Sequence, residues 1–591
     1  MLEGGFYRTC CKRGSFKRFR RWRIPCHLAN GQECSSLLNL CIHRITQDIG
    51  EFNTFSALPR DLSQRIFNNF VCSCRLTPAS LQAFRDCDLN DIYLGEYGGL
   101  AVSDGWMDVI SSQGSSLLHL DLSGSDVTDH GLTYLRDCKN IISLNLNHCH
   151  QISDRGLEFI SGLSNLTSLS FRRNNAISAQ GLSTFPGLVN LVKLDLERCL
   201  AIHGGVVHLQ GLTRLESLNM KWCNCIEDAD IEPLSALTNL KSLEISFSKV
   251  TDVGISFLKG LKKLALLNLE GCHVTAACLD FLAELPALSH LNLSRCDFSN
   301  NGCEKFSRLE NLNVLNLGFN YITDACLVHL KGLTKLKSLN LDSCTIYDEG
   351  LIHLAGKFSI GSNFLTQHFC CPIIRSCGNL CFYLVGHQQL KCLELSDTEI
   401  GSNGLHHLSG LSSLEKINLS FTMVNDSGLS KLCGLSSLKS LNLDAPQITD
   451  TGLASLTSLT GLTDLDLFGA RITDSGTNYL KHFKNLRLLE ICGGGLTDDG
   501  VKNIKELSSL TCLNLSQNCS LTDTTLELIS GLTGLISLNV SNSGITIDGL
   551  RHLKRLENLR SLSLESCKVT ANDIKKLQST HLPNLASFRP Q

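Results

Sequence analysis

The sequence predicts an α/β solenoid, a horseshoe whose short strands line the inside and whose helices cover the outside, behind a short all-α N-terminal region. A motif of the form LxLxxx recurs at steps of 24 or 25 residues through most of the 591-residue chain. Each copy begins with alternating apolar residues, which indicate a strand, and continues with apolar residues three or four apart, which indicate a helix. Such a unit cannot bury its apolar face alone, so the copies must stack on one another.

The motif occurs in eighteen copies, and the segment that starts at Leu462, "LTDLDLFGARITDSGTNYLKHFKN", is well kept. The period lies in the range of about 20 to 29 residues that is typical of leucine-rich repeats. The repeats extend over residues 89–591, where a degenerate first copy precedes the eighteen. The first apolar residue of each motif stands at position 120, 144, 169, 194, 218, 243, 267, 291, 315, 339, 393, 417, 441, 465, 489, 513, 538 and 562.

The residue five places after the first Leu of each motif should turn the chain and point inward, where a small polar group satisfies buried backbone groups. Seven of the eighteen copies have Cys there. This pattern resembles the cysteine-containing subclass of leucine-rich repeats that is typical of F-box/LRR proteins, and the phrase "ITDxGLxxL" resembles plant members. The seven residues are Cys149, Cys199, Cys223, Cys272, Cys296, Cys344 and Cys567.

An Asp recurs in the phrase "TD" of many copies and could suggest carboxylate catalysis. It precedes a predicted helix each time, where Thr and Asp accept hydrogen bonds from unpaired N–H groups and favour the helix dipole. The Gly-rich stretch "GGGLTDDG" at 493–500 lacks the Lys-Ser/Thr of a phosphate loop and is read as a turn. We therefore expect no enzymatic activity and no cofactor. The recurrent residues are Asp129, Asp252, Asp324, Asp450, Asp474 and Asp498.

One step between motifs is 54 residues, which leaves 54 − 24 = 30 extra residues at 357–386. The Cys spacing in this stretch, C-C-x5-C-x3-C, matches none of the common zinc patterns. Two interpretations remain open, a retained intron in the gene model and a loop extruded from the solenoid. In both, the flanking copies should still stack on each other.

The front of the chain carries no repeats. Residues 1–35 form a basic tail that we expect to be disordered, with eight Arg or Lys and no acid between residues 8 and 23. Residues 36–88 predict three short helices, of which the second begins near Pro59 and the third near Pro78. These helices either cap the first repeat or dock on a partner.

Two short patterns in residues 36–88 resemble docking boxes of ubiquitin ligase subunits. "LPRDLSQRIF" resembles the opening of an F-box, which binds a Skp-type adaptor, although the later Val-Cys-Lys-x-Trp phrase is missing. An elongin-binding box followed by a cullin-selecting box fits the same region. The resemblance implies adaptor-binding roles for Ser36, Leu37, Cys41, Ile45, Leu58, Pro59, Leu62, Ile66 and Phe67.

Residues three and four places after each motif Leu are expected at the border of the concave face. Aromatic and Arg residues, which supply much of the energy at protein interfaces, gather there over neighbouring copies. A formal net charge of −3 makes a protein target the better expectation than nucleic acid. The expected target-binding residues are Arg172, Arg173, Arg198, Lys221, Trp222, Phe247, Arg295 and Phe319.

Together the repeats and these resemblances imply a non-enzymatic substrate-recognition subunit of a plant-type cullin-RING (SCF-type) ubiquitin ligase. It would hold a Skp-type adaptor or elongin with a cullin, and direct a bound target to ubiquitination and proteasomal degradation. The alternative is a leucine-rich-repeat interaction scaffold without a ligase. No window is apolar enough to span a membrane, and the 29 cysteines fit a reduced environment. We expect a cytoplasmic or nuclear protein.

Overall fold

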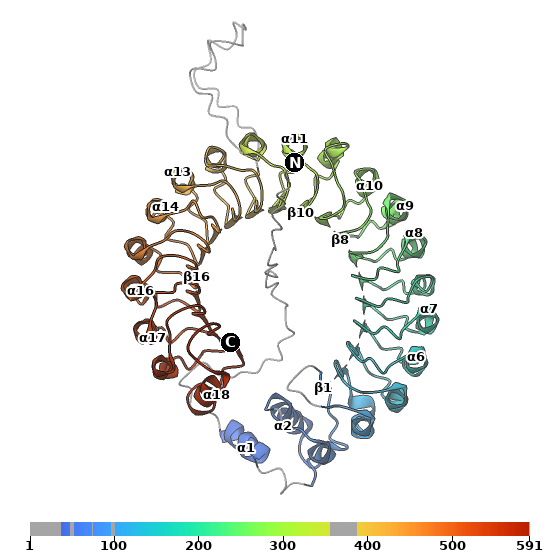
Figure 1. Ribbon diagram of the computed structural model, residues 1–591. Coiled ribbons are helices and arrows are strands. Elements are labelled where there is room, and N and C mark those ends of the chain that lie inside the picture. Colours follow the sequence, from blue (N-terminus) through green and yellow to red (C-terminus); the bar gives the residue numbers. More distant parts are fainter. Residues whose placement is uncertain (1–36, 48–52, 74, 96–100, 355–386, 590–591) are drawn as a thin grey trace, which may run out of the picture.

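The computed structural model describes residues 37–47, 53–73, 75–95, 101–354 and 387–589. Twenty parallel strands form one continuous sheet on the inside of a ring-like horseshoe, and helices cover the outside (Figure 1). The predicted α/β solenoid is confirmed. The strands are β1 (Asp91–Tyr93), β2 (His119–Asp121), β3 (Ser143–Asn145), β4 (Ser168–Ser170), β5 (Lys193–Asp195), β6 (Ser217–Asn219), β7 (Ser242–Glu244), β8 (Leu266–Asn268), β9 (His290–Asn292), β10 (Val314–Asn316), β11 (Ser338–Asn340), β12 (Cys392–Glu394), β13 (Lys416–Asn418), β14 (Ser440–Asn442), β15 (Asp464–Asp466), β16 (Leu488–Glu490), β17 (Cys512–Asn514), β18 (Ser537–Asn539), β19 (Ser561–Ser563) and β20 (Ser587–Arg589).

The strands keep one register along the sheet. Each pairs with its neighbours in sequence, so that Leu144 of β3 lies between Leu120 of β2 and Leu169 of β4. The central residue of a strand is buried, and the residues on either side of it are partly exposed on the inner face. The alternation read from the motif therefore separates core from inner surface in most copies, although in β8 Asn268 is buried as well.

A short helix follows most strands on the outer side. The α-helices are α1 (Leu37–Gln47), α2 (Arg60–Cys72), α3 (Pro78–Leu81), α4 (Met107–Ser111), α5 (Asp129–Leu132), α6 (Asp154–Ile160), α7 (Ala179–Leu182), α8 (Asp228–Ile231), α9 (Asp252–Ser256), α10 (Cys278–Leu282), α11 (Asp324–Leu330), α12 (Leu405–Leu408), α13 (Asp426–Leu429), α14 (Asp450–Ser455), α15 (Asp474–Thr477), α16 (Asp498–Ile504), α17 (Asp523–Ile529) and α18 (Ala571–Thr580). After β5, β9, β11 and β18 a 3-10 helix takes this place, at Val206–Leu209, Cys303–Arg308, Asp348–His353 and Ile547–Arg555 respectively.

The recurrent "TD" phrase starts these helices and also joins neighbouring repeats. Thr473 is the N-cap of α15, and its hydroxyl accepts a hydrogen bond from the Ser475 N–H. The carboxylate of Asp450, one repeat earlier, accepts hydrogen bonds from the Thr473 N–H (2.9 Å) and hydroxyl (2.6 Å). A Cβ atom on Gly476 would lie only 2.1 Å from Asp450 Oδ1, which explains the Gly of the phrase. The structural interpretation of these Asp residues is confirmed, and their bond to the next repeat is an added finding.

The small polar residue five places after the motif Leu has the predicted inward role. Cys199 Sγ donates a hydrogen bond to the carbonyl oxygen of Phe171 in the preceding repeat (3.4 Å). Asn320 Nδ2 donates to Leu293 in the same way (2.8 Å). Burial raises the pKa of the Cys199 thiol to about 12, so it stays protonated and able to donate at neutral pH.

The N-terminal helices close the front end of the sheet. α2 begins directly after Pro59 and α3 begins at Pro78, as the sequence predicts. The side chain of Gln64 on α2 accepts hydrogen bonds from the N–H of Asn90 and Asp91 (3.0 and 3.1 Å) and donates to the carbonyl of Asp91 (2.7 Å). It thereby satisfies backbone groups at the edge strand β1, which would otherwise remain unpaired.

An aromatic core joins these helices to the first repeat. The rings of Phe55, Phe67 and Phe70 surround Phe84 at centroid distances of 4.9, 5.2 and 5.8 Å. All four side chains are buried. α2 and α3 therefore pack against the first repeat and cover the end of the solenoid core.

The 357–386 insertion and the basic tail lie outside the described residues. The copies on either side of the insertion do stack, since Leu339 of β11 lies opposite Leu393 of β12 in the common register. Among the described residues, no helix is long and apolar enough to cross a membrane.

Candidate protein-interaction surface

The strands end in a turn that forces an unusual backbone conformation on the next residue. Asn219 at the end of β6 accepts a hydrogen bond from the N–H of Lys221 (3.1 Å) and so turns the chain out of the sheet. Trp222, four residues after the motif Leu, then adopts the left-handed conformation with φ of 61°. The same conformation recurs at this position in all copies except that of Ala445, whose successor Pro446 disfavours it.

We call these +4 positions the rim. The left-handed conformation favours Gly and costs other residues about 1 kcal/mol each. Four copies do have Gly at the rim, at positions 124, 271, 469 and 493. Large side chains nevertheless occupy it at His148, Arg173, Arg198, Trp222, Phe247, Arg295, Phe319 and Phe421. Residues that the local backbone disfavours, set side by side on a surface, indicate a function other than folding.

Rim side chains from adjacent repeats stack into a ladder. The Trp222 and Phe247 rings are parallel, 3.8 Å apart between centroids and 9° between planes. The Arg198 guanidinium lies 5.2 Å from the Trp222 ring, within the distance of a cation–π contact. On the other side Phe247 covers Gly271, where a Cβ atom would lie 2.6 Å from the ring. Parallel strands about 4.8 Å apart bring the rings into contact, because each strand contributes one rim residue.

A second pair lies beyond Gly271. The Arg295 guanidinium lies 3.7 Å from the centre of the Phe319 ring. Tyr321, two residues further along, is 73% exposed. The rim therefore presents two groups of Arg and aromatic side chains, separated by the Gly271 repeat.

A recess of about 450 Å³ opens at the N-terminal end of the ladder. Two imidazoles, two guanidiniums and the Trp222 indole line it, together with small polar and apolar groups. Its lining residues are His148, His150, Arg173, Asn175, Arg198, Leu200, Trp222 and Asn224.

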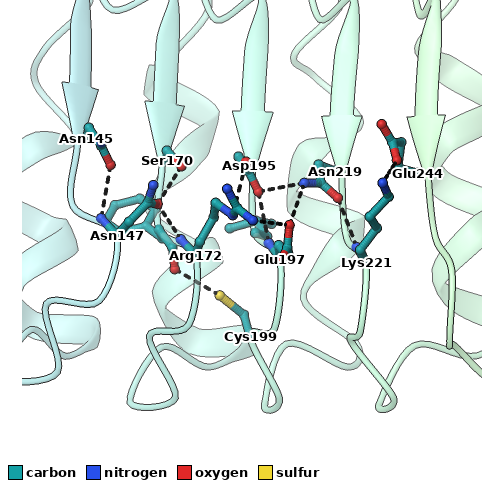
Figure 2. A network of polar contacts seen from close by, with 12 residues as sticks. Asn145, Asn147, Ser170, Arg172, Asp195, Glu197, Cys199, Asn219, Lys221 and Glu244 are labelled. Atoms are coloured by element: carbon teal, nitrogen blue, oxygen red, sulfur yellow. Dashed lines mark hydrogen bonds and ion pairs between the residues drawn. The ribbon is translucent and has the colours of Figure 1, made fainter. Parts of the chain in front are cut away.

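The inner strand face beside the recess is polar and its charges are paired (Figure 2). Arg172 binds Glu197 at 2.6 Å and lies 3.7 Å from Asp195, while Lys221 forms an ion pair with Glu244. Burial raises the pKa of the Asp195 carboxyl, although Arg172 and backbone hydrogen bonds act in the opposite direction. These lysine and arginine charges thus stabilise the inner face.

The structure separates the predicted target-binding residues into three sets. Arg173, Arg198, Trp222 and Phe247 meet in the ladder and the recess. Arg295 and Phe319 meet in the second group. Arg172 and Lys221 lie one residue earlier in their repeats, side by side with carboxylates on the inner face, so we no longer count them as target contacts.

Several exposed rim neighbours escape a search of the +3 and +4 positions. His150 lines the recess beside the rim residue His148, which the prediction left out, and exposed apolar side chains follow the same edge of the solenoid further along. The periodic signal that finds them is the +6 position, two residues after the rim, whose side chains line the recess together with the rim in four copies. The exposed apolar residues at +6 are Leu200, Tyr321 and Met423.

The predicted adaptor-binding residues of α2 lie in different environments. Ile66 and Phe67 are buried in the cap core, at 2% and 0% exposure. Leu58 and Pro59 are exposed, and Leu62 is half-buried. Because reaching Ile66 and Phe67 requires opening the cap, we reassign these two residues to its core.

The first box lies on α1. Ser36 falls outside the described residues. Leu37 is 78% exposed and Cys41, one turn later, is also exposed, whereas Ile45 is half-buried against the core. The helix is anchored by Ile42 and Thr46 on its other side, so its Leu37 and Cys41 face remains open to solvent.

Within the described part of the chain, no group of three or more His, Cys, Asp or Glu residues could hold a metal ion. A family model described as "Leucine Rich repeat" matches residues 115–135, 137–161, 236–259, 285–307, 332–355, 410–433 and 506–530. No sequence among the curated proteins matches the chain.

Many solved structures resemble the chain at low sequence identity. An internalin from Listeria monocytogenes is 18% identical with a TM-score of 0.36, over 76% of this chain and 97% of that one. TLR13 in its complex with ssRNA13 is 21% identical with a TM-score of 0.46, over 85% and 68%. The Arabidopsis receptor kinase HAESA, in complex with the peptide hormone IDA and the co-receptor SERK1, is 18% identical with a TM-score of 0.43, over 94% and 86%.

Sequence identities and TM-scores as low as these say nothing about the ligands of this chain. The repeat period, the strand register and the seven matched segments, by contrast, are observed in this chain directly. They show that the chain folds as a leucine-rich-repeat solenoid.

Proposed function

We propose that this protein is the target-recognition subunit of a cullin-RING ubiquitin ligase. The rim captures the target protein, and the N-terminal helices join the solenoid to the ligase. The observation that carries the recognition role is the run of Arg and aromatic residues at a backbone position that favours Gly. Ubiquitin transfer itself belongs to other subunits.

The exposed face of α1 supports an adaptor of the elongin type. Leu37, Leu40 and Cys41 are spaced as one helical face, and Leu37 and Leu40 are 78% and 56% exposed. An apolar helix face of this kind suits a groove in a partner. The F-box interpretation has less support, because Ile66 and Phe67 of its pattern are buried in the cap.

A pull-down with purified components tests the adaptor. The full-length protein is immobilised and offered an elongin complex or a Skp-type adaptor, each with its cullin. We expect elongin to be retained, and retention to fall at least about tenfold in Leu37→Ser/Cys41→Ser, because the buried apolar contact is lost. His43→Ser, an exposed residue on the same helix, is the matched control and should retain elongin fully.

A second variant separates the two boxes. If Leu58→Ala/Pro59→Ala loses a Skp-type adaptor while the α1 variant keeps it, the F-box interpretation replaces the elongin one. If the intact protein retains neither adaptor, the ligase proposal is wrong. The alternative, a binding scaffold without a ligase, would then hold, and the hydrogen bonds between the Gln64 side chain of α2 and the backbone of Asn90 and Asp91 support a capping role for this helix.

A further inference from the structure

The recess at the start of the ladder has the chemistry of an anion site beside a stacking surface. We propose that it recognises an anionic side chain, carboxylate or phosphate, in an extended segment of the target, and that a flat or apolar side chain next to the anion packs along Trp222 and Phe247. This inference rests on the proposed function only in that the ligand belongs to a target protein.

The charges of the recess are available to a ligand. In the described residues no carboxylate forms an ion pair with Arg173 or Arg198, in contrast to Arg172 and Lys221 on the inner face. Among the charged and aromatic side chains that the structure describes, Arg198 contacts only the face of Trp222, which leaves its guanidinium edge for an anion. A guanidinium fork matches carboxylate and phosphate in bidentate geometry.

The shape of the recess fits one or two anionic groups. Its lining comes from four neighbouring repeats, whose strands are about 4.8 Å apart, so it spans roughly 15 Å. About four extended residues cover that length. The ladder continues from it as an uncharged aromatic surface of Trp222 and Phe247.

The surroundings disfavour a polyanion such as single-stranded nucleic acid. Carboxylates face the inner surface along the same repeats, and a continuous phosphate chain would pass close to them. Between the recess and the next rim guanidinium, that of Arg295, the rim carries only Trp222, Phe247 and Gly271, whereas nucleic-acid grooves carry basic groups along the whole path. The acidic residues of the inner face in these repeats are Asp195, Glu197, Glu244 and Glu270.

Selection from a random peptide library tests the proposal without knowledge of the target. Displayed 12-residue peptides are selected against the full-length protein and against Arg173→Glu/Arg198→Glu. We expect wild-type selections to be enriched in Asp or Glu beside an aromatic or aliphatic residue, and the charge-reversed variant to lose that enrichment. Arg471→Glu, an exposed +6 residue of a later repeat, is the matched control and should select the same peptides as wild type.

Binding of one selected peptide then identifies the source of the anion. Its acidic residue is kept, replaced by phosphoserine or replaced by serine, and fluorescence anisotropy measures each affinity. The serine form should bind at least about tenfold more weakly than the better anionic form, and Arg173→Gln/Arg198→Gln should remove that difference. Circular dichroism and thermal midpoints confirm that the variants are folded.

Two results would overturn the inference. One is a wild-type selection without acidic enrichment, or an enrichment that survives charge reversal at the recess. The other is tighter binding of a twelve-nucleotide oligothymidylate than of the selected peptide at the same salt concentration. Neither result involves α1, so loss of elongin binding and loss of acidic-peptide binding are separate outcomes.

Discussion

The rim of the first half of the solenoid and the rim of the second half share a backbone but differ in their side chains. Arg173, Arg198 and Trp222 have φ of 59°, 60° and 61°. Gly493 and Asn542 in the second half have φ of 71° and 55°. The second half mostly uses small or polar residues at the rim, with Phe421 as its one large apolar exception, whereas large side chains predominate in the first half beside Gly124 and Gly271.

This difference distinguishes what the fold requires of the rim from what a binding surface requires of it. The left-handed turn recurs in both halves, with the copy of Ala445 as the exception, and it accompanies the strand-end hydrogen bond and the stacked strands rather than any particular rim side chain. The second half shows that small residues meet that requirement. The large residues of the first half therefore add nothing that the fold needs, and the surface they form is where we place the target.

The largest expected effect comes from the bond between repeats that both halves share. Gly181→Val and Gly476→Val place side-chain atoms where the preceding Asp carboxylate lies, because a Cβ alone would be 2.3 and 2.1 Å from Asp154 and Asp450. Each should lower the stability by about 3 kcal/mol through overpacking and lost hydrogen bonds. Urea unfolding midpoints measure this.

The control for these variants is Gly531→Val, because a Cβ atom added at Gly531 would have no heavy atom within 4 Å. Its effect should be much smaller. Equal effects of all three substitutions would show that the Asp–Gly contact is not what joins the repeats, and a large effect in one half alone would break the equivalence of their frameworks.

The next effect concerns the inward-pointing donors. Cys199→Ala removes the thiol donor to the buried carbonyl oxygen of Phe171, which keeps only the hydrogen bond from the Asn174 N–H (3.2 Å), and should cost about 1 kcal/mol. Asn518→Ala should cost about 2 kcal/mol, because its amide donates to the carbonyls of both Ile491 and Leu515 (2.8 and 3.0 Å). Denaturant midpoints compare the two. Cys199→Ser keeps a donor, so a loss as large as that of alanine would contradict this role of the thiol.

An exchange of rim residues between the halves tests the comparison directly. Arg173→Gly should raise the stability by up to about 1 kcal/mol and weaken peptide binding, because it relieves backbone strain and removes a charge. Gly493→Arg should lower the stability by about the same amount. Thermal midpoints and peptide anisotropy measure the two properties. A destabilising Arg173→Gly would show that this side chain serves the fold.

The smallest effect lies at the junction between the halves. His387 is fully buried at a position where neighbouring copies have Leu333 and Leu411, and its Nδ1 lies 3.1 Å from the Leu333 carbonyl oxygen. Burial lowers the pKa of this imidazole. As the pH falls below about 6.5, this imidazole therefore binds a proton in the unfolded chain before it does so in the folded chain, and the free energy of unfolding decreases as the pH falls.

His387→Leu should remove this contribution to the pH dependence and stabilise the protein at pH 5 to 6. Thermal midpoints between pH 5 and 8 test it, and above pH 7 the effect of protonation should vanish. An unchanged slope of stability against pH would mean that the imidazole is protonated in the folded state as readily as in the unfolded chain.

The sequence alone determined the solenoid, its register and the inward-pointing donors, because repeated spacing reports directly which side chains stack on which. It also located helix starts at Pro59 and Pro78. It placed Arg172 and Arg173 together, however, although one is neutralised on the inner face and the other lines the recess.

Tertiary structure decided that distinction, and it also decided that Ile66 and Phe67 belong to the cap core while Leu37 and Cys41 face solvent. The physical reason is that pairing and burial depend on the residues of neighbouring repeats. The motif of one repeat determines the path of its backbone. Whether a side-chain charge is neutralised and whether a side chain is exposed depend on the neighbouring repeats, which lie within a few ångströms.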